Sequence, residues 1–268
     1  MEGMWTRIAL LVWVALILVF LFTPIVLIFV YAFNTSNIQS WPIPGFTLAW
    51  FSRTWEDAEV RRALELSLQA GLTATALALV LGSCAAFAIH RMTWFGKEVV
   101  SLMFVLPLAL PGIVTGIALN AFFSFGGVPL SVWTIVVGHT TFCIVIVYNN
   151  VLARLRRTQG SLIEAAMDLG ANGFQVFRDI TLPLISTSIV AGAMLAFALS
   201  FDEVIVTTFT AGAQNTLPLW IFGAIRLGQR LPEVNVVVSF VILVTIVPVL
   251  IAARLTGGGG TSRVPAAR

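Results

Sequence analysis

Apolar residues fall in long, nearly uninterrupted runs that are separated by short polar passages. Each run is close to the roughly 20 residues that an α-helix needs to cross the hydrocarbon core of a bilayer. Runs of this length favour membrane-spanning helices over the shorter apolar segments of a soluble core. The pattern therefore predicts an all-α, polytopic membrane protein. The six predicted spans cover residues 8–33, 65–89, 99–124, 132–153, 186–209 and 235–253.

Two of these runs need a separate interpretation. The first is longer than the roughly 7–15 apolar residues of a signal peptide, and no A-x-A-like cleavage site follows, so we expect a retained helix. The third contains Pro107, Pro111, Gly112 and Gly116. Such residues indicate a kink or break whose freed carbonyls are satisfied by neighbours, or close helix packing. Both interpretations are favoured over direct contact with a ligand.

The passages between the runs complete the expected organisation. Residues 34–63 and 210–234 are expected to form polar loops, and residues 126–131 a tight turn. Residues 1–255 then form one transmembrane domain. The glycine-rich residues 256–268 are expected to form a flexible cytoplasmic tail.

Composition agrees with a membrane protein and narrows the function. Hydrophobic residues make up 59% of the 268 residues and charged residues 10%, with a mean hydropathy of +0.98. A soluble domain carries about 25% charged residues. The net charge of +3 comes from basic residues scattered at the ends of spans, which disfavours nucleic-acid binding. Cys84 and Cys143 lie inside apolar runs and are expected to be packing residues rather than a disulfide or metal ligands.

Basic residues also predict the orientation. If both termini are cytoplasmic, ten of the 15 Lys and Arg residues lie in inner segments and five in outer segments. This bias fits the tendency of cytoplasmic loops to carry the excess of positive charge. The orientation puts residues 161–183 in the cytoplasm.

Residues 161–183 carry a regular pattern in an otherwise polar connection between the fourth and fifth spans. Ser161 and Glu164 have the spacing of a capping box, which predicts the start of a short helix. Gly170 can end that helix, because glycine tolerates the left-handed conformation that follows many helices.

A second short helix is expected directly afterwards. Asn172 and Gln175 repeat the cap spacing, and Phe174 and Phe177 fall on roughly one face. Pro183 has no N–H and disfavours helical geometry before it, so it predicts a break ahead of the fifth span.

This segment resembles the EAA loop of bacterial ABC importer permeases. The matching residues are Glu164-Ala165-Ala166, Gly170, Ile180 and Leu182-Pro183. The resemblance implies the MetI-like fold with short cytoplasmic coupling helices that dock into a groove on an ATP-hydrolysing subunit. Glu164 and Gly170 would hold the shape of the loop, and Phe174 and Phe177 would be docking knobs. The implied coupling residues are Glu164, Ala165, Ala166, Gly170, Asn172, Phe174, Phe177, Leu182 and Pro183. The alternative is an amphipathic connector that lies on the membrane surface.

Motifs of catalysis and metal binding are absent from the sequence. There is no G-x-x-x-x-G-K-[ST] phosphate loop, no nucleophile elbow, no H-E-x-x-H and no Cys/His ligand spacing. His139 lies within a span and is expected to be a hydrogen-bonded interior residue. We therefore expect a non-enzymatic chain without a metal or cofactor of its own, with ATP and Mg²⁺ held by a partner ATPase.

Two carboxylates interrupt the fifth run. Asp202 and Glu203 lie about 24 Å from its cytoplasmic end at 1.5 Å per residue, in the outer part of the membrane. An ionisable group there costs up to about 2.5–3.5 kcal/mol and should face a cavity or a partner. Ser200, Glu203 and Thr207 would form a polar stripe on a continuous helix.

The residues alone leave two interpretations of this pair open. The carboxylates could line a path for a cationic substrate, or they could form an ion pair with an arginine such as Arg226 or Arg230, or be solvated at the interface. The predicted substrate-pathway residues are Asp202, Glu203, Ser200 and Thr207.

The chain resembles spermidine/putrescine importer permeases over nearly its whole length, most clearly in its carboxyl-terminal half. The matching residues are the Asp202-Glu203 stretch, Leu217-Pro218, Ile221-Phe222 and Pro232-Glu233-Val234-Asn235. The resemblance implies a multi-pass permease subunit in the bacterial cytoplasmic (inner) membrane, within an ATP-driven importer of polyamines. Its implied partners are a second permease subunit, two ABC ATPase subunits, an extracytoplasmic substrate-binding protein and membrane lipid. Alternatives are an ABC permease for iron, phosphonate or sulfate and, less favoured, a stand-alone secondary transporter.

Overall fold

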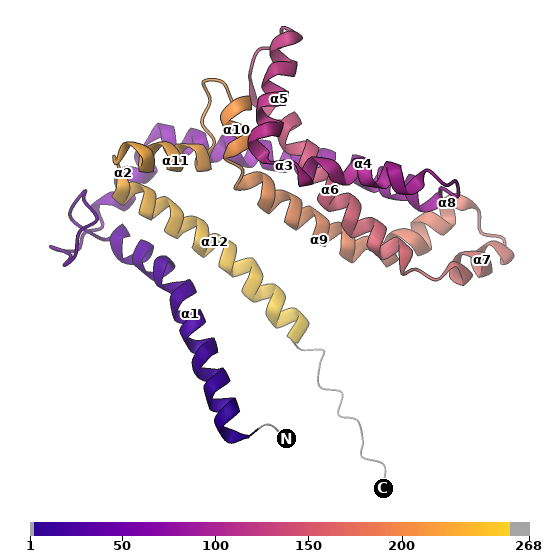
Figure 1. The fold of residues 1–268 in the computed structure, drawn as a ribbon, viewed down its shortest axis with the longest axis horizontal. Helices are drawn as coiled ribbons and strands as arrows, with labels where there is room; N and C mark the ends of the chain where they lie inside the picture. Colours follow the sequence, from indigo (N-terminus) through magenta and orange to yellow (C-terminus); the bar gives the residue numbers. More distant parts are fainter. Residues whose placement is uncertain (1–2, 258–268) are drawn as a thin grey trace. The chain divides into compact units, whose positions relative to one another are not determined.

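The computed structural model describes residues 3–257, with side chains as far as Ile246. Within these residues the regular secondary structure is helical, apart from one isolated bridge between Asn34 and Phe46, so the all-α prediction is confirmed (Figure 1). The elements are α1 (Met4–Ala32), α2 (Ala49–Glu56), α3 (Ala58–Arg91), α4 (Lys97–Ala109), α5 (Gly112–Phe125), α6 (Val132–Arg156), α7 (Gly160–Asp168), α8 (Gly173–Val176), the π-helical segment η1 (Phe177–Thr181), α9 (Leu182–Phe201), α10 (Ile205–Thr210), α11 (Leu217–Leu227) and α12 (Leu231–Gly257).

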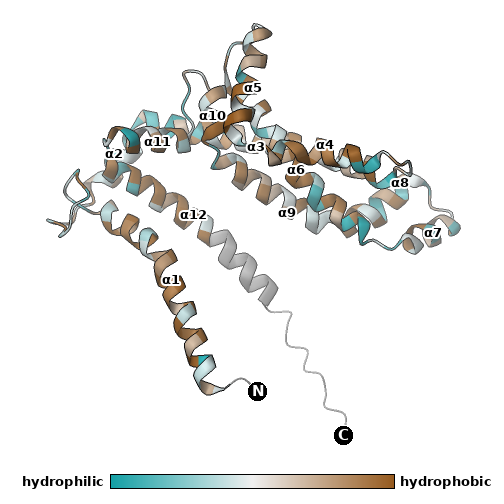
Figure 2. Ribbon diagram, in the orientation of Figure 1, coloured by the Kyte–Doolittle hydropathy of each residue, from teal (hydrophilic) through white to brown (hydrophobic). Residues whose placement is uncertain are grey.

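Several of these helices have the length and apolarity of membrane spans. In the described part of the chain, four helical runs are long and apolar enough: α1, α3, α6 and the run Gly173–Phe201. The pair α4–α5 is a fifth candidate, bent by 99° at the break. The helix α12 contains the predicted sixth span. Figure 2 shows α1 apolar along most of its length, and its side chains from Met4 to Leu27 are almost all exposed, as expected of a helix that faces lipid.

The described part of the chain divides into two compact units, residues 3–58 with 223–257 and residues 59–222. In the first unit α12 packs against α1 and α2, and the Trp55 and Phe240 rings lie 5.7 Å apart. Arg230 precedes α12 and pairs with Asp57 and with Glu233, whose Oε2 accepts from Nε at 2.7 Å. Partial burial acts to lower the pKa of Arg230, but the two carboxylates outweigh it and raise that pKa. Arg230 is thus held by acids of its own unit.

In the second unit the helix α6 is the most deeply buried element. It packs antiparallel against α9 along a regular seam, which small residues allow to close tightly. A Cβ on Gly192 would lie 3.4 Å from the Val147 backbone. The seam pairs, in order along α6, are His139 with Ser200, Cys143 with Ala196, Val147 with Gly192, and Arg154 with Leu184.

The structure corrects several sequence predictions. The expected loop 34–63 contains α2 and the start of α3, and the expected loop 210–234 contains α11. The fifth span is not continuous to residue 209, because α9 ends at Phe201 and α10 starts at Ile205. The break predicted in the third span is confirmed at residues 110–111. Of the expected tail 256–268, residues 258–268 lie outside the described residues, and residues 256–257 belong to α12.

Candidate functional site

The helix α7 begins and ends by different means. The predicted capping box is wrong: Gln159 is the N-cap, no side chain caps the helix, and Ser161 already lies in its first turn. The predicted end is confirmed. Gly170 has φ +87° and donates its N–H to the Met167 carbonyl at 2.9 Å, while the Ala171 N–H reaches the Ala166 carbonyl at 3.0 Å. These two bonds form a Schellman motif, which satisfies carbonyls that the helix end leaves open.

The second cap of the segment is formed as the sequence predicts. Asn172 Oδ1 accepts from the Gln175 N–H at 3.0 Å, and Gln175 Oε1 accepts from the Asn172 N–H at 2.8 Å. The break predicted at Pro183 is absent, because α8, η1 and α9 form one helical run. The wider turn of η1 explains this, since the Leu182 N–H bonds to the Phe177 carbonyl five residues back. A π turn next to the proline relieves the loss of an ordinary helical bond.

The segment 161–183 carries large apolar side chains that protrude into the surroundings. Glu164 and Ala165 are exposed and Ala166 is half-buried, while Leu182 and Pro183 open α9 and are exposed. The protruding apolar side chains are Leu162, Met167, Leu169 and Phe174, with exposed fractions of 47%, 52%, 89% and 68%. An exposed apolar patch of this kind is typical of a contact with a protein partner or a membrane.

The two phenylalanines of the segment differ. Phe174 is exposed, whereas Phe177 is half-buried and its ring meets Phe87 of α3 edge-on at 5.6 Å. The docking role of Phe174 stays a prediction, while Phe177 packs η1 against its own chain. A cavity of about 450 Å³ opens beside them and is lined also by Arg91.

The predicted substrate-pathway residues lie around the break between α9 and α10. Asp202 is exposed and Glu203 is half-buried. Glu203 Oε1 accepts from the Val206 N–H at 2.9 Å, so this carboxylate caps the first turn of α10. The predicted polar stripe on a continuous helix is wrong, because the helix is interrupted at residues 202–204. Among the side chains described as far as residue 246, neither carboxylate forms an ion pair with an arginine.

A buried histidine joins the two sides of this break. His139 of α6 is 1% exposed; its Nδ1 lies 2.7 Å from Ser200 Oγ and its Nε2 lies 2.8 Å from Thr207 Oγ1. Thr207 Oγ1 donates its proton to the Glu203 carbonyl at 2.6 Å. The hydroxyl has one proton, so Nε2 must be the donor to Thr207, and Nδ1 accepts from Ser200. His139 therefore acts as a clamp between Ser200 on one side of the break and Thr207 on the other, and the prediction of a hydrogen-bonded interior histidine is confirmed.

Helix α10 is fixed on its other sides by α5 and α6. Asn120 Nδ2 donates to the Phe209 carbonyl, and Thr134 Oγ1 donates to the Thr210 carbonyl, both at 2.7 Å. A Cβ on Gly116 would lie 2.5 Å from the Phe209 ring. The carbonyls at the end of this six-residue helix are thus satisfied by side chains, as a buried helix end requires.

The structure keeps the two groups of predicted residues apart. They lie at opposite ends of α9, which is about 30 Å long for its 20 residues. The Asp202 carboxylate is exposed at a helix break, where its negative charge can attract a cation. Within the described residues no cluster of three or more His, Cys, Asp or Glu side chains could hold a metal ion.

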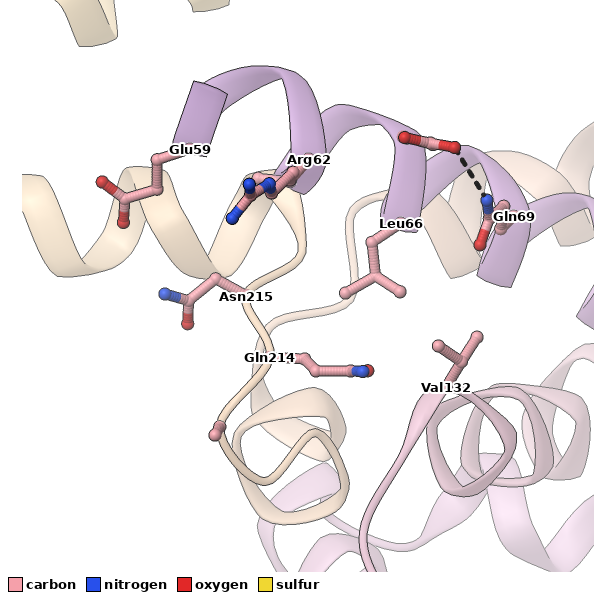
Figure 3. Close-up of a pocket in the computed structure, with 10 residues that line it drawn as sticks. Glu59, Arg62, Leu66, Gln69, Val132, Gln214 and Asn215 are labelled. Atoms are coloured by element: carbon pink, nitrogen blue, oxygen red, sulfur yellow. Dashed lines mark hydrogen bonds between the residues drawn. The ribbon is translucent and has the colours of Figure 1, made fainter. Parts of the chain in front are cut away.

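A further pocket was not predicted from the sequence. It has a volume of about 640 Å³ and lies between the first turns of α3, the start of α6 and residues 213–215 (Figure 3). Gln214 points between Leu66 and Val132, and Glu65 Oε1 accepts from Gln69 at 3.2 Å. Its signal in the sequence is the polar stripe Glu59, Arg62 and Gln69, which straddles the boundary between the predicted loop 34–63 and the second span.

Comparisons with known proteins agree with this architecture. The family described as "Binding-protein-dependent transport system inner membrane component" matches residues 78–257. The chain is 34% identical over 247 residues to the spermidine/putrescine transport system permease protein PotC of Shigella flexneri, covering 90% of this chain and 92% of the relative. It is 34% identical over 235 residues to the putrescine transport system permease protein PotI of Escherichia coli K12, covering 83% and 82%.

Solved structures share the fold at lower sequence identity. A bacterial ABC transporter involved in the import of the acidic polysaccharide alginate contains a chain with a TM-score of 0.68 and 16% identity. The match covers 97% of this chain and 99% of that chain. This likeness shows the fold, and the MetI-like prediction is confirmed.

Proposed function

The chain belongs to the family of binding-protein-dependent transport system inner membrane components, and from this premise we propose that it is the polyamine-translocating permease subunit of an ATP-driven importer. The observation that carries the proposal is the 34% identity, over most of the chain, to permeases named for spermidine and putrescine. The fold alone does not choose a substrate, since one fold serves many functions.

The geometry of the break supports a cationic substrate. Asp202 is exposed at an interruption of a spanning helix, and Glu203 lies beside it. A carboxylate in a partly desolvated path attracts a protonated amine and repels an anion. We propose that these two residues attract the amine as it passes, while Ser200 and Thr207 act through His139 to hold the helix ends in place.

The segment 161–183 supports coupling to ATP hydrolysis by a partner. The end of α7 and the start of α8 are capped, and the apolar side chains of the segment are available to a second protein. In the proposed mechanism two ATPase subunits bind on the cytoplasmic side, and their closure pushes this segment. The continuous run α8–η1–α9 then carries the movement toward the break. A second permease, an extracytoplasmic binding protein and cytoplasmic termini complete the proposed arrangement.

ATP-dependent uptake of labelled putrescine and spermidine into vesicles that hold the full complex tests the proposal. We expect uptake by the unaltered complex and at least a tenfold loss in Asp202→Asn/Glu203→Gln, a loss of about 1.4 kcal/mol or more in transition-state stabilisation. The glutamine retains an acceptor for the Val206 N–H, so the charge is removed while the cap of α10 is kept. The double variant should therefore assemble normally.

Two results would contradict the polyamine assignment: absence of uptake of either amine by the unaltered complex, or normal uptake by the double variant. If an anionic or iron-containing solute were transported instead, the alternative of another ABC permease would replace it.

A further inference from the structure

A polar cleft lies at the end of the α6–α9 seam that is remote from His139. It has a volume of about 420 Å³. The polar and charged side chains that line it come from the carboxyl-terminal end of α6 and the first turns of α9. They are Asn149, Asn150, Arg154, Arg157, Thr187 and Ser188. None of them belongs to the predicted coupling or substrate-pathway residues.

The cleft carries two positive charges without acidic partners in the described structure. Arg154 Nε donates to the Leu184 carbonyl at 2.9 Å, which fixes the guanidinium across the seam. Among the side chains described as far as residue 246, no carboxylate forms an ion pair with Arg154 or Arg157. Two guanidinium groups beside hydroxyl and amide groups suit an oxyanion such as a phosphate, to which arginine binds strongly.

The position of the cleft selects a membrane source for that phosphate. From Arg157, which caps α6, to Asn150 the cleft extends about 10 Å along the helix axis, so it is long enough to cross the roughly 5–7 Å headgroup layer on one side of a bilayer and reach the edge of the hydrocarbon core. Basic pockets between helices on the cytoplasmic side of membrane proteins bind anionic headgroups. In the proposed orientation this end of α6 is cytoplasmic.

The surface of α9 offers a place for an acyl chain. Thr187, Val190 and Met194 follow one another at i, i+3 and i+7 on one face of the helix. Val190 and Met194 are 58% and 56% exposed. A polar head in the cleft would therefore continue into an apolar stripe that leads toward the middle of the membrane, which a free phosphate ion would not use.

From these observations we infer that the cleft between α6 and α9 binds the phosphate headgroup of an anionic phospholipid. The lipid bridges Arg154 of α6 and the C-cap residue Arg157 to Thr187 and Ser188 of α9, and so braces the helix that follows the segment 161–183. The transported amine is not the ligand, because two arginines repel a polycation. The inference depends on the cytoplasmic placement of this end and not on the identity of the substrate.

Native mass spectrometry of the purified full complex, titrated with phosphatidylglycerol or phosphatidylcholine, tests the inference. We expect phosphatidylglycerol to bind in preference and Arg154→Gln/Arg157→Gln to weaken its binding at least tenfold, at about fivefold per arginine. The matched control is Arg156→Gln, because Arg156 is exposed on the same turn but does not line the cleft. It should change binding by less than about threefold, since it removes a charge but no contact with the headgroup.

Further variants and competitors distinguish a lipid site from a general effect of charge and from a site for free phosphate. Arg157→Gln alone leaves the Arg154–Leu184 bond intact, so it should keep the melting temperature of the complex and weaken phosphatidylglycerol binding about fivefold.

Equal losses of lipid binding in Arg156→Gln and in the double variant would overturn the inference. Displacement of the lipid by millimolar inorganic phosphate would show a site for the free ion instead. Retention of phosphatidylglycerol by the double variant would also overturn it. The experiment measures lipid binding and not amine uptake, so a negative result for the lipid site is distinct from a negative result for the proposed function.

Discussion

The segment 161–183 and the break at residues 202–204 lie at the two ends of α9, and they are stabilised in opposite ways. The segment is held by bonds between near neighbours in the sequence, such as the Asn172–Gln175 cap, and its apolar side chains are exposed. The break is held by side chains from other helices, above all by His139, which is buried.

The difference indicates a division of roles along one helix. A segment that keeps its own shape and exposes apolar side chains suits docking against a partner. A break that depends on contacts with α5 and α6 changes when those helices move. The connecting run from Gly173 to Phe201 is continuous and can transmit a displacement between the two ends. Substitutions should therefore affect protein stability at the break and partner binding at the segment.

The largest effect on stability is expected from His139→Ala. It removes both hydrogen bonds across the break and leaves the buried Ser200 hydroxyl without its acceptor beside a cavity, while Thr207 keeps its bond to the Glu203 carbonyl. We expect a loss of about 2–4 kcal/mol, seen as a lower melting temperature of the purified complex. The chain's other histidine, His90, is exposed, so His90→Ala is the control. An equal melting temperature for the two variants would show that the clamp contributes nothing.

A smaller loss of stability is expected when a glycine packed against α10 is replaced by alanine, whereas the same change at the start of α7 should cost nothing. At the break, Gly116→Ala would bring a Cβ to 2.5 Å from the Phe209 ring and should cost about 1–3 kcal/mol through overpacking. In α7, Gly160→Ala meets nothing within 4 Å and should be neutral or slightly stabilising. Thermal unfolding of both variants measures this. A neutral Gly116→Ala would mean that α5 and α10 are not tightly packed.

The smallest effect on overall stability is expected from Gly170→Ala, because the segment is exposed. The left-handed conformation, φ +87°, costs a residue with a Cβ about 1–2 kcal/mol, so the end of α7 should fray. Amide hydrogen exchange of residues 165–171 should accelerate while the melting temperature stays unchanged. Gly170→Asn should exchange more slowly than Gly170→Ala, since asparagine tolerates this conformation. Unchanged exchange in Gly170→Ala would contradict the Schellman end.

The local features of the segment could be predicted from sequence because short-range chemistry decides them. Gly170 and the Asn172–Gln175 box behave as expected, since a left-handed residue and a reciprocal cap involve only neighbours. The prediction for Ser161 is wrong, because α7 starts one residue before it and the serine lies in the first turn. The prediction for Pro183 is also wrong, because a π turn absorbs the missing hydrogen bond.

The break could not be predicted from sequence because distant residues create it. The apolar pattern resumes directly after Asp202 and Glu203 and so favours one long helix. His139 lies 61 residues before Ser200 and 68 before Thr207, and no local pattern links them. The polar cleft between Arg154 and Thr187 arises in the same way, from the register of two helices that are separated by the segment.

The coupling role of residues 161–183 is tested most directly by comparing Phe174→Ala with Phe177→Ala in vesicles that hold the full complex, with ATP hydrolysis and amine uptake measured together. Phe174 is exposed, so its loss should weaken ATPase binding about tenfold or more and abolish coupled uptake without lowering the melting temperature. Phe177 packs on Phe87, so its loss should lower the melting temperature instead. Normal ATP-driven uptake by Phe174→Ala would contradict the assignment of residues 161–183 as the coupling element.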